Sequence, residues 1–352
     1  MKYNNVYIEP FICRLPDEIV TTDALEQRLA PLYTRLKLPY GRLELMTGIR
    51  ERRIWPAGRL PGDESVATVQ KLLDAASFDP NEVGAFIHAS VCRDYQEPAT
   101  ACHVHQRLKL SQQCAVFDIS NACLGLLTGM VQVANMIELG QISAGIVVGT
   151  ETSRSLMETT ITRLLTDTTL DRRSIKEIFA SLTIGSGSAA VLLTNRDLTR
   201  SGRRLLGGVV QANTHWSHLC RSEVDATAGG TADGIYMRTD SERLMAEGVA
   251  TAKIAFDRFL TELNWTGNAI DRTFCHQVGK AHQKLLFDTL ELDTAKNFVT
   301  LPFLGNTGSV ALPTAAALGF ESGFVQPGDQ IALLGIGSGI NVIMLGIGPA
   351  SN

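Results

Sequence analysis

The sequence predicts an α/β protein made of two copies of one unit, with an insertion in the first copy. Short apolar runs alternate with amphipathic segments, an order typical of a mainly parallel, buried sheet covered by helices. The same series of elements follows Asn121 and Asn306: a turn, a helix, a strand, a Gly-Ser-Gly turn and a further strand. The first copy is longer by a polar helical segment, about residues 153–182. We expect this insertion to form a helical cap over a site.

The individual elements are predicted from hydrophobic periodicity. Strands are expected at Val6–Phe11, Val83–Ala89, Ala115–Ile119, Ala144–Val148, Ala189–Leu193, Gln330–Leu334 and Asn341–Leu345. Helices are expected at Ile19–Leu38, Glu64–Ala76, Ala101–Leu108, Leu124–Leu139 and Leu312–Leu318. Thr21 and Thr22 are available to cap the first of these helices. The two halves are expected to cover residues 1–200 and 201–352.

Composition narrows the class of protein. Hydrophobic residues make up 45% of the 352, enough for a substantial core. The net charge is −4 and basic residues form no long run, so we expect no nucleic-acid partner. The most apolar stretch, 331–347, is broken by glycines, so no membrane span is expected. The start lacks the apolar core of a signal peptide, and the seven cysteines lack disulfide-scaffold spacing; both features predict a cytoplasmic protein with free thiols.

Cys123 stands where a predicted strand turns into a predicted helix. The unpaired N–H groups and the positive dipole end of a helix N-terminus favour a thiolate. Its small neighbours Ala122 and Gly125 leave room for a substrate carbonyl. The alternative is a buried cysteine that packs as a small hydrophobic residue.

Two residues of the second half are candidate partners for Cys123. His276 ends a predicted strand, 273–276, a position where α/β proteins place functional groups, although a hydrogen-bonded core histidine is the alternative. Asn306 opens the second-half helix as Asn121 precedes the first, and it is either a helix cap or a donor into a site. Cysteine, histidine and asparagine together predict acyl transfer, in which the thiolate attacks a thioester. Backbone N–H groups would stabilise the tetrahedral oxyanion.

Two further patterns are set aside. The glycines of 335–339 resemble a dinucleotide-binding loop, but Ile340 stands at the third glycine position and a strand follows. His103 and His105, with Cys102, lie on a predicted helix, where positions two apart do not share a face. We therefore expect neither a dinucleotide nor a metal.

Over essentially its whole length the chain resembles the thiolase superfamily, and within it the ketoacyl-ACP synthase III-like condensing enzymes. The matching stretches are Thr47–Ile54, Ser120–Gly125, Cys275–Gln277, Gly305–Gly308 and Gly335–Gly339. The resemblance implies a five-layered αβαβα fold, a homodimer and no cofactor apart from the acyl thioester substrate. It also implies an acyl-Cys123 intermediate with His276 and Asn306 as partners, and an oxyanion hole formed by the N–H groups of Cys123 and Gly339.

Within that family the chain looks most like the OleA type, which joins two fatty acyl-CoA molecules without decarboxylation. The position of Glu97, 26 residues before Cys123, is apolar in synthase III but a glutamate in OleA-type enzymes, where it reaches the neighbouring subunit's site. Segment 153–182 is the second shared feature. A condensation that releases no CO₂ must remove an α-proton, and a carboxylate can be that base. From the residues alone, we would interpret Glu97 as a surface loop carboxylate beside Arg93.

The chain departs from synthase III at the carrier site. The Trp and Arg that hold the CoA adenine there correspond to Arg42 and Met46 here. The carrier of the acyl group is therefore either CoA or ACP. Arg50 and Arg53 are either solvated or phosphate contacts, and we predict them to bind substrate.

The sequence thus predicts a condensing enzyme that converts two fatty acyl-CoA molecules to a 2-alkyl-3-keto acid, a precursor of long-chain olefins or ketones. Two alternatives remain. One is decarboxylative condensation of an acyl-CoA with malonyl-ACP, in which Glu97 is idle. The other is a non-catalytic protein that binds acyl chains.

Overall fold

The computed structural model describes residues 1–224 and 235–350. Its main sheet has nine strands in the order β11-β12-β13-β8-β1-β7-β6-β4-β5. The bounds are β1 Tyr7–Arg14, β4 Ala85–His88, β5 Ala115–Asp118, β6 Ala144–Glu151, β7 Gly187–Thr194, β8 Arg203–Ala212, β11 Arg272–Cys275, β12 Ile331–Gly337 and β13 Asn341–Pro349. Strands β1 and β8 share a single paired position, so the sheet divides there into a first-half part and a second-half part.

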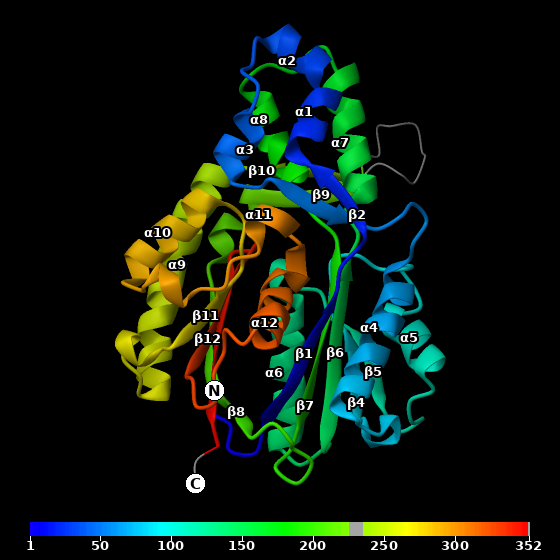
Figure 1. Ribbon diagram of the computed structural model, residues 1–352, viewed down its shortest axis with the longest axis vertical. Coiled ribbons are helices and arrows are strands. Elements are labelled where there is room, and N and C mark those ends of the chain that lie inside the picture. Colours follow the sequence, from blue (N-terminus) through cyan, green and yellow to red (C-terminus); the bar gives the residue numbers. More distant parts are fainter. Residues whose placement is uncertain (225–234, 351–352) are drawn as a thin grey trace.

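Helices on both sides of each part give five layers (Figure 1). Helices α4 (Pro61–Ala76) and α5 (Thr100–Leu108) cover the first part, and a core of their apolar residues packs on β4, β6 and β7. Helices α9 (Ser241–Leu263) and α10 (Lys280–Leu290) cover the second part in the same way. Between the parts lie α6 (Gly125–Glu138) and α12 (Ala311–Glu321). This is the expected αβαβα arrangement.

The inner helices are apolar on nearly every side because both faces are covered. Buried residues of α6 and α12 belong to one core with residues of β1, β4, β6, β7, β12 and β13. Each inner helix is preceded by a short 3-10 turn, at Ala122–Leu124 and at Gly308–Val310. The order of turn, helix and two strands therefore occurs in both halves, as the repeat in the sequence predicted.

The segment inserted in the first half is helical and lies at one end of the molecule, above the sheet (Figure 1). It contains α7 (Arg154–Thr166), α8 (Ser174–Phe179) and the turn Ala180–Thr183. Its apolar residues share a separate core with the early helices α1 (Thr22–Arg28), α2 (Ala30–Leu36) and α3 (Arg42–Thr47). Two small two-stranded antiparallel sheets, β2 (Glu18–Thr21) with β3 (Glu51–Ile54) and β9 (Cys220–Val224) with β10 (Ile235–Thr239), accompany these helices. The remaining short helix, α11, covers Leu301–Leu304.

Two expectations about the elements are wrong. The sheet is mixed: β4 is parallel to β5 and β6, and β11 to β12, but the other pairs are antiparallel. A three-residue turn joins β12 to β13, and so short a connection can only reverse the chain. Residues 19–21 belong to strand β2, and Thr21 caps α1 by accepting a hydrogen bond from the Ala24 N–H over 3.1 Å.

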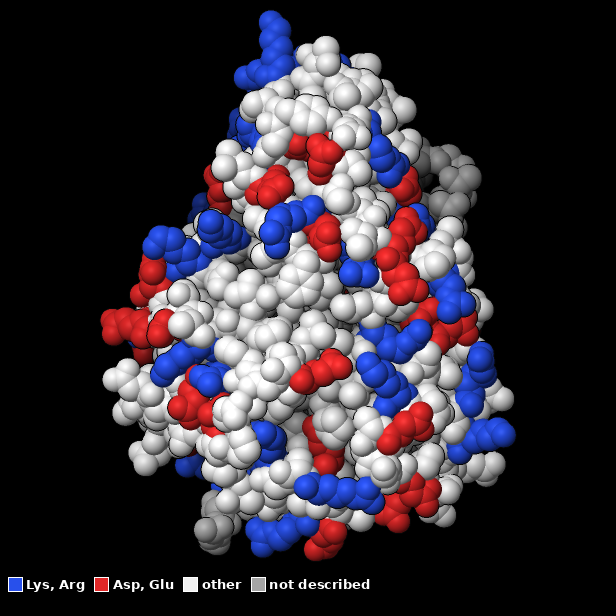
Figure 2. Space-filling view, in the orientation of Figure 1, with Lys and Arg blue, Asp and Glu red and all other residues white. Residues whose placement is uncertain are grey.

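Charged side chains of both signs are interspersed over the face of the molecule in Figure 2, and the middle of that face is largely uncharged. In the described part of the chain, no helix is long and apolar enough to cross a membrane.

Candidate active site

Cys123 lies in the turn between β5 and α6, where the sequence placed it. Ala122 adopts a left-handed φ of 44°, and the Leu124 N–H closes the turn on the Asn121 carbonyl over 2.9 Å. The turn rests against Gly337 at the end of β12, where an added Cβ would lie 2.9 Å from Leu124 Cγ and 3.7 Å from Cys123 Cβ. A side chain at this glycine would displace the nucleophile's turn.

Two backbone N–H groups approach the Cys123 sulfur. The N–H groups of Cys123 itself and of Ser338 hydrogen-bond to the thiol and favour its ionised form. Ser338 lies one residue before Gly339, the donor expected from the resemblance. In the turn between β12 and β13, it is therefore the Ser338 amide that approaches the sulfur.

Burial outweighs those two donors. Loss of solvent, together with the charges of Cys220 and Glu151, raises the pKa of the Cys123 thiol to about 12. The thiolate expected from the helix N-terminus is thus not the resting form near neutral pH. The thiol must lose its proton as it attacks the substrate.

His276 directly follows β11 and is only 4% exposed. Neither ring nitrogen has a hydrogen-bond partner among the described residues. Burial, together with nearby His282, lowers the pKa of His276 to about 3, so the imidazole is neutral at neutral pH. A buried neutral imidazole with two unpaired nitrogens is suited to hydrogen-bond a substrate oxygen.

Asn306 is held between the cap and the turn before α12. Its N–H donates to the Thr183 carbonyl and its carbonyl accepts from the Gly185 N–H, both over 2.9 Å. Its side-chain Oδ1 accepts from the Gly308 N–H over 3.0 Å. With Oδ1 engaged, the Nδ2 group is the end of the side chain left to donate.

These residues converge through their supporting elements. The turns Ala122–Leu124 and Gly308–Val310 pack against each other. The His276 N–H bonds to the Leu334 carbonyl on β12 over 3.3 Å, and the end of the same strand supports Cys123. The sheet and the two inner helices therefore place Cys123, His276 and Asn306 toward the end of the sheet that lies below the cap.

Glu97 lies on an exposed loop between β4 and α5. Its side chain is exposed, as are Val91 and Tyr95 on the same loop. Both ends of the loop are fixed. The N–H groups of Val91 and Cys92 bond to Glu151, and those of Thr100 and Ala101 bond to Asp118.

The two predicted substrate-binding arginines differ in their surroundings. Arg50 is exposed, and Arg53 is half-buried with Nη1 bonded to the Pro16 carbonyl over 3.3 Å. Between them, Arg52 points inward to Thr22 Oγ1, and its burial lowers its pKa to about 10. Arg50 is thus the freer of the two to contact a substrate.

Sequence reasoning missed two residues of this region, Ser338 and Glu151. Glu151 is 5% exposed at the end of β6 and also contributes to the pKa of Cys123. A glutamate that directly ends a fully buried strand was the available signal. Ser338 was passed over because a serine between two glycines resembles a simple turn.

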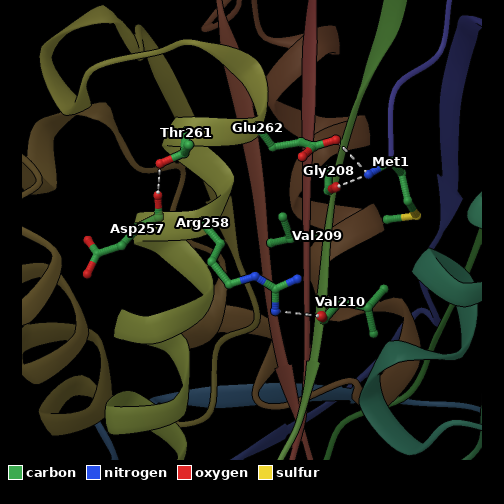
Figure 3. Close-up of a pocket in the computed structure, with 8 residues that line it drawn as sticks. All are labelled: Met1, Gly208, Val209, Val210, Asp257, Arg258, Thr261 and Glu262. Carbon is green, nitrogen blue, oxygen red and sulfur yellow. Dashed lines mark hydrogen bonds and ion pairs between the residues drawn. The ribbon is translucent and has the colours of Figure 1, made fainter.

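A separate groove of about 490 Å³ lies between β8 and α9 (Figure 3). The Met1 ammonium bonds there to Glu262 and to the Gly208 carbonyl, over 2.9 and 3.0 Å. None of the predicted site residues lines this groove.

The fold and the site together define a thiolase-superfamily condensing enzyme, an acyltransferase. Residues 63–201 match the family model for the thiolase N-terminal domain. Residues 260–345 match that for the C-terminal part of 3-oxoacyl-[acyl-carrier-protein] synthase III.

Proteins of similar sequence indicate which type of condensing enzyme this chain is. An acyl-CoA:acyl-CoA alkyltransferase of Shewanella oneidensis is 41% identical over 99% of both chains. One from Xanthomonas campestris pv. campestris is 33% identical over 98% of both. A crystal structure of a Xanthomonas campestris OleA variant with bound lauric acid and lauroyl-CoA has a TM-score of 0.92, with 32% identity over 98% of this chain and 99% of that one. The chain belongs to this OleA-type family of acyl-CoA:acyl-CoA alkyltransferases.

Proposed function

We propose that this enzyme joins two fatty acyl-CoA molecules head to head, in a Claisen condensation without decarboxylation. The observation that carries the proposal is a half-buried Cys123 in a region that also holds the buried His276 and Asn306, in a chain that presents Glu97 on an exposed loop anchored at both ends. The names of the relatives supply the substrate class. The chain's own groups perform every step, without a metal or cofactor.

In the first half-reaction, Cys123 Sγ attacks the thioester carbonyl of one acyl-CoA. The new S–C bond forms, the bond to the CoA sulfur breaks, and the thiol proton leaves with CoA. The N–H groups of Cys123 and Ser338 hold the oxyanion of the tetrahedral intermediate. The high pKa of Cys123 makes proton removal part of this step.

In the second half-reaction, Glu97 of the partner subunit removes an α-proton from a second acyl-CoA. Neutral His276 and the Asn306 amide donate hydrogen bonds to the enolate oxygen. The α-carbon attacks the acyl-Cys123 carbonyl, the S–C bond breaks, and the proton held by the partner's Glu97 returns to Cys123. Water then hydrolyses the remaining thioester, giving a 2-alkyl-3-keto acid and the second CoA.

The second step requires a homodimer, which we propose to form along β5. This strand ends the sheet order, and its outer edge has no partner strand among the described residues. An open edge is a surface on which a second copy can pair. The Glu97 loop leads into α5, which packs on the same strand.

Arg50 and Arg53 are the proposed contacts for the phosphates of the acyl carrier, which we propose to be CoA rather than ACP. We place the enzyme in the cytoplasm, where its free thiols stay reduced. All seven cysteines are unpaired in the structure.

The Glu97→Gln variant tests the proposal. Incubation with a long-chain acyl-CoA should leave an acyl group on Cys123, visible by protein mass, with little keto acid formed. Glu291→Gln, an exposed glutamate after α10, serves as control and should behave as the wild type. Condensation by the Glu97→Gln variant at the wild-type rate would refute the role of Glu97. A requirement for malonyl-ACP would instead indicate the decarboxylative reaction.

A further inference from the structure

We infer that Glu151 is a positioning residue that holds the loop carrying Glu97 and the turn carrying Asn306 in a fixed relation. One buried carboxylate would then support parts of two active sites in the dimer. The inference rests on the proposed function, because it assigns Glu97 to the partner subunit's site.

The Glu151 carboxylate is shared between two chain segments. Oε1 accepts from the Val91 N–H over 3.0 Å, and Oε2 accepts from the Cys92 N–H over 3.2 Å. Oε1 also accepts from the Ser309 N–H over 3.3 Å and from the Ser309 hydroxyl over 2.5 Å. Val91 and Cys92 begin the loop to Glu97, and Ser309 lies in the turn that follows Asn306.

The surroundings favour a carboxylate at this position. The N–H groups of Val91, Cys92 and Ser309 and the Ser309 hydroxyl all donate to Glu151, and an ionised carboxylate is the side chain that only accepts. A glutamine would turn an N–H₂ group toward at least one donor and break that contact. The space is also filled, because a Cβ at Gly308 would lie 3.2 Å from Glu151 Cγ. These donors compensate the buried charge of Glu151.

Loss of the Glu151 carboxylate should displace two segments, and each segment serves a different active site. Displacement of the Ser309 turn shifts Asn306, which serves the Cys123 of the same subunit. Displacement of residues 91–92 shifts Glu97, which serves the partner's site. Acylation of Cys123 uses neither Asn306 nor Glu97, so it should persist while condensation slows.

Mixed dimers with differently tagged subunits test this inference. Only one subunit keeps Cys123, and its partner carries Cys123→Ala. Glu151→Gln is placed either in the subunit with Cys123 or in the subunit without it. We expect condensation to fall about 10- to 100-fold in both arrangements, the range for a misplaced reacting group, with acylation within about threefold of the intact mixed dimer. Ser309→Ala, which removes one of the four contacts, should slow condensation only when it lies in the subunit with Cys123.

Two controls make the outcomes decisive. Glu9→Gln alters another buried carboxylate, 6% exposed, which accepts from Thr194, Thr199 and the Arg200 N–H. It should lower the melting temperature without changing the ratio of condensation to acylation. Glu97→Ala in the subunit without Cys123 should abolish condensation. If that control loses condensation while Glu151→Gln in the same subunit does not, the inference is overturned.

Failure of the proposed function looks different, because Glu97→Ala in the subunit without Cys123 would then have no effect. If Glu151→Gln does not fold, the Ser309→Ala variant tests whether the contact between Glu151 and Ser309 positions Asn306. Equal condensation by Ser309→Ala in both arrangements would contradict the inference.

Discussion

Asn341 donates a hydrogen bond from Nδ2 to Oδ1 of Asn121 over 3.0 Å. Asn121 precedes the turn that carries Cys123, and Asn341 begins β13 just after the turn that carries Ser338. Asn121 is itself oriented by donating from Nδ2 to Thr128 Oγ1 over 2.9 Å. The bond between the two asparagines therefore holds together the two backbone N–H groups that face the Cys123 sulfur.

Removal of this link should slow acylation. We expect Asn341→Ala to lower the rate of CoA release in the first turnover about tenfold, because the Ser338 N–H is no longer held toward the oxyanion. Asn341→Asp should lower this rate further, because it places a carboxylate next to Asn121 Oδ1. Rapid-quench measurement of the first CoA released gives the rate. Wild-type acylation by both variants would show that the link does not position the donor.

The pH dependence of Cys123 alkylation tests the raised pKa of its thiol. With a pKa of about 12, the thiolate fraction rises about tenfold per pH unit across pH 7–10, and the rate should follow without a plateau. Glu151→Gln removes one of the negative charges that raise this pKa, so the curve should move to lower pH. Peptide mass spectrometry after iodoacetamide treatment separates Cys123 from the other six cysteines. A plateau near pH 8.5, the value of an ordinary thiol, would contradict the burial argument.

Gly185 connects the cap to Asn306 and should not tolerate a side chain. A Cβ there would lie 2.1 Å from the Leu304 carbonyl oxygen, which belongs to backbone and cannot rotate away. We expect Gly185→Ala to lower the free energy of unfolding by about 3 kcal/mol and to abolish condensation by shifting Asn306. Gly267→Ala, where nothing lies within 4 Å of the added Cβ, is the matched control. Urea denaturation and product formation measure both effects, and equal stability of the two variants would refute the prediction.

Much of the fold could be predicted because its signals are local. The apolar run before Asn121 and the proline-free run after it predicted β5 and α6 to within about a residue, and the repeat predicted the second half. The direction of a strand depends on the path that the connecting segment takes back to the sheet. Hydrophobic periodicity does not encode that path. The sheet was therefore expected to be mainly parallel, and it is mixed.

The site was predictable where a residue type itself indicates chemistry. Cys123, His276 and Asn306 were predicted in this way, and Glu97 through the family resemblance. Ser338 contributes a backbone N–H near the Cys123 sulfur, so its side chain carries no signal, and the resemblance pointed instead to the neighbouring Gly339. Glu151 acts through hydrogen bonds to residues 60 positions earlier and 158 later in the chain, which only the folded structure brings together.

The most direct test of the central claim is incubation of the pure enzyme with one long-chain acyl-CoA and no other substrate. We expect release of both CoA molecules for each 2-alkyl-3-keto acid formed, with loss of product in Cys123→Ala. Absence of keto acid, or its formation only after malonyl-ACP is added with release of CO₂, would contradict head-to-head condensation.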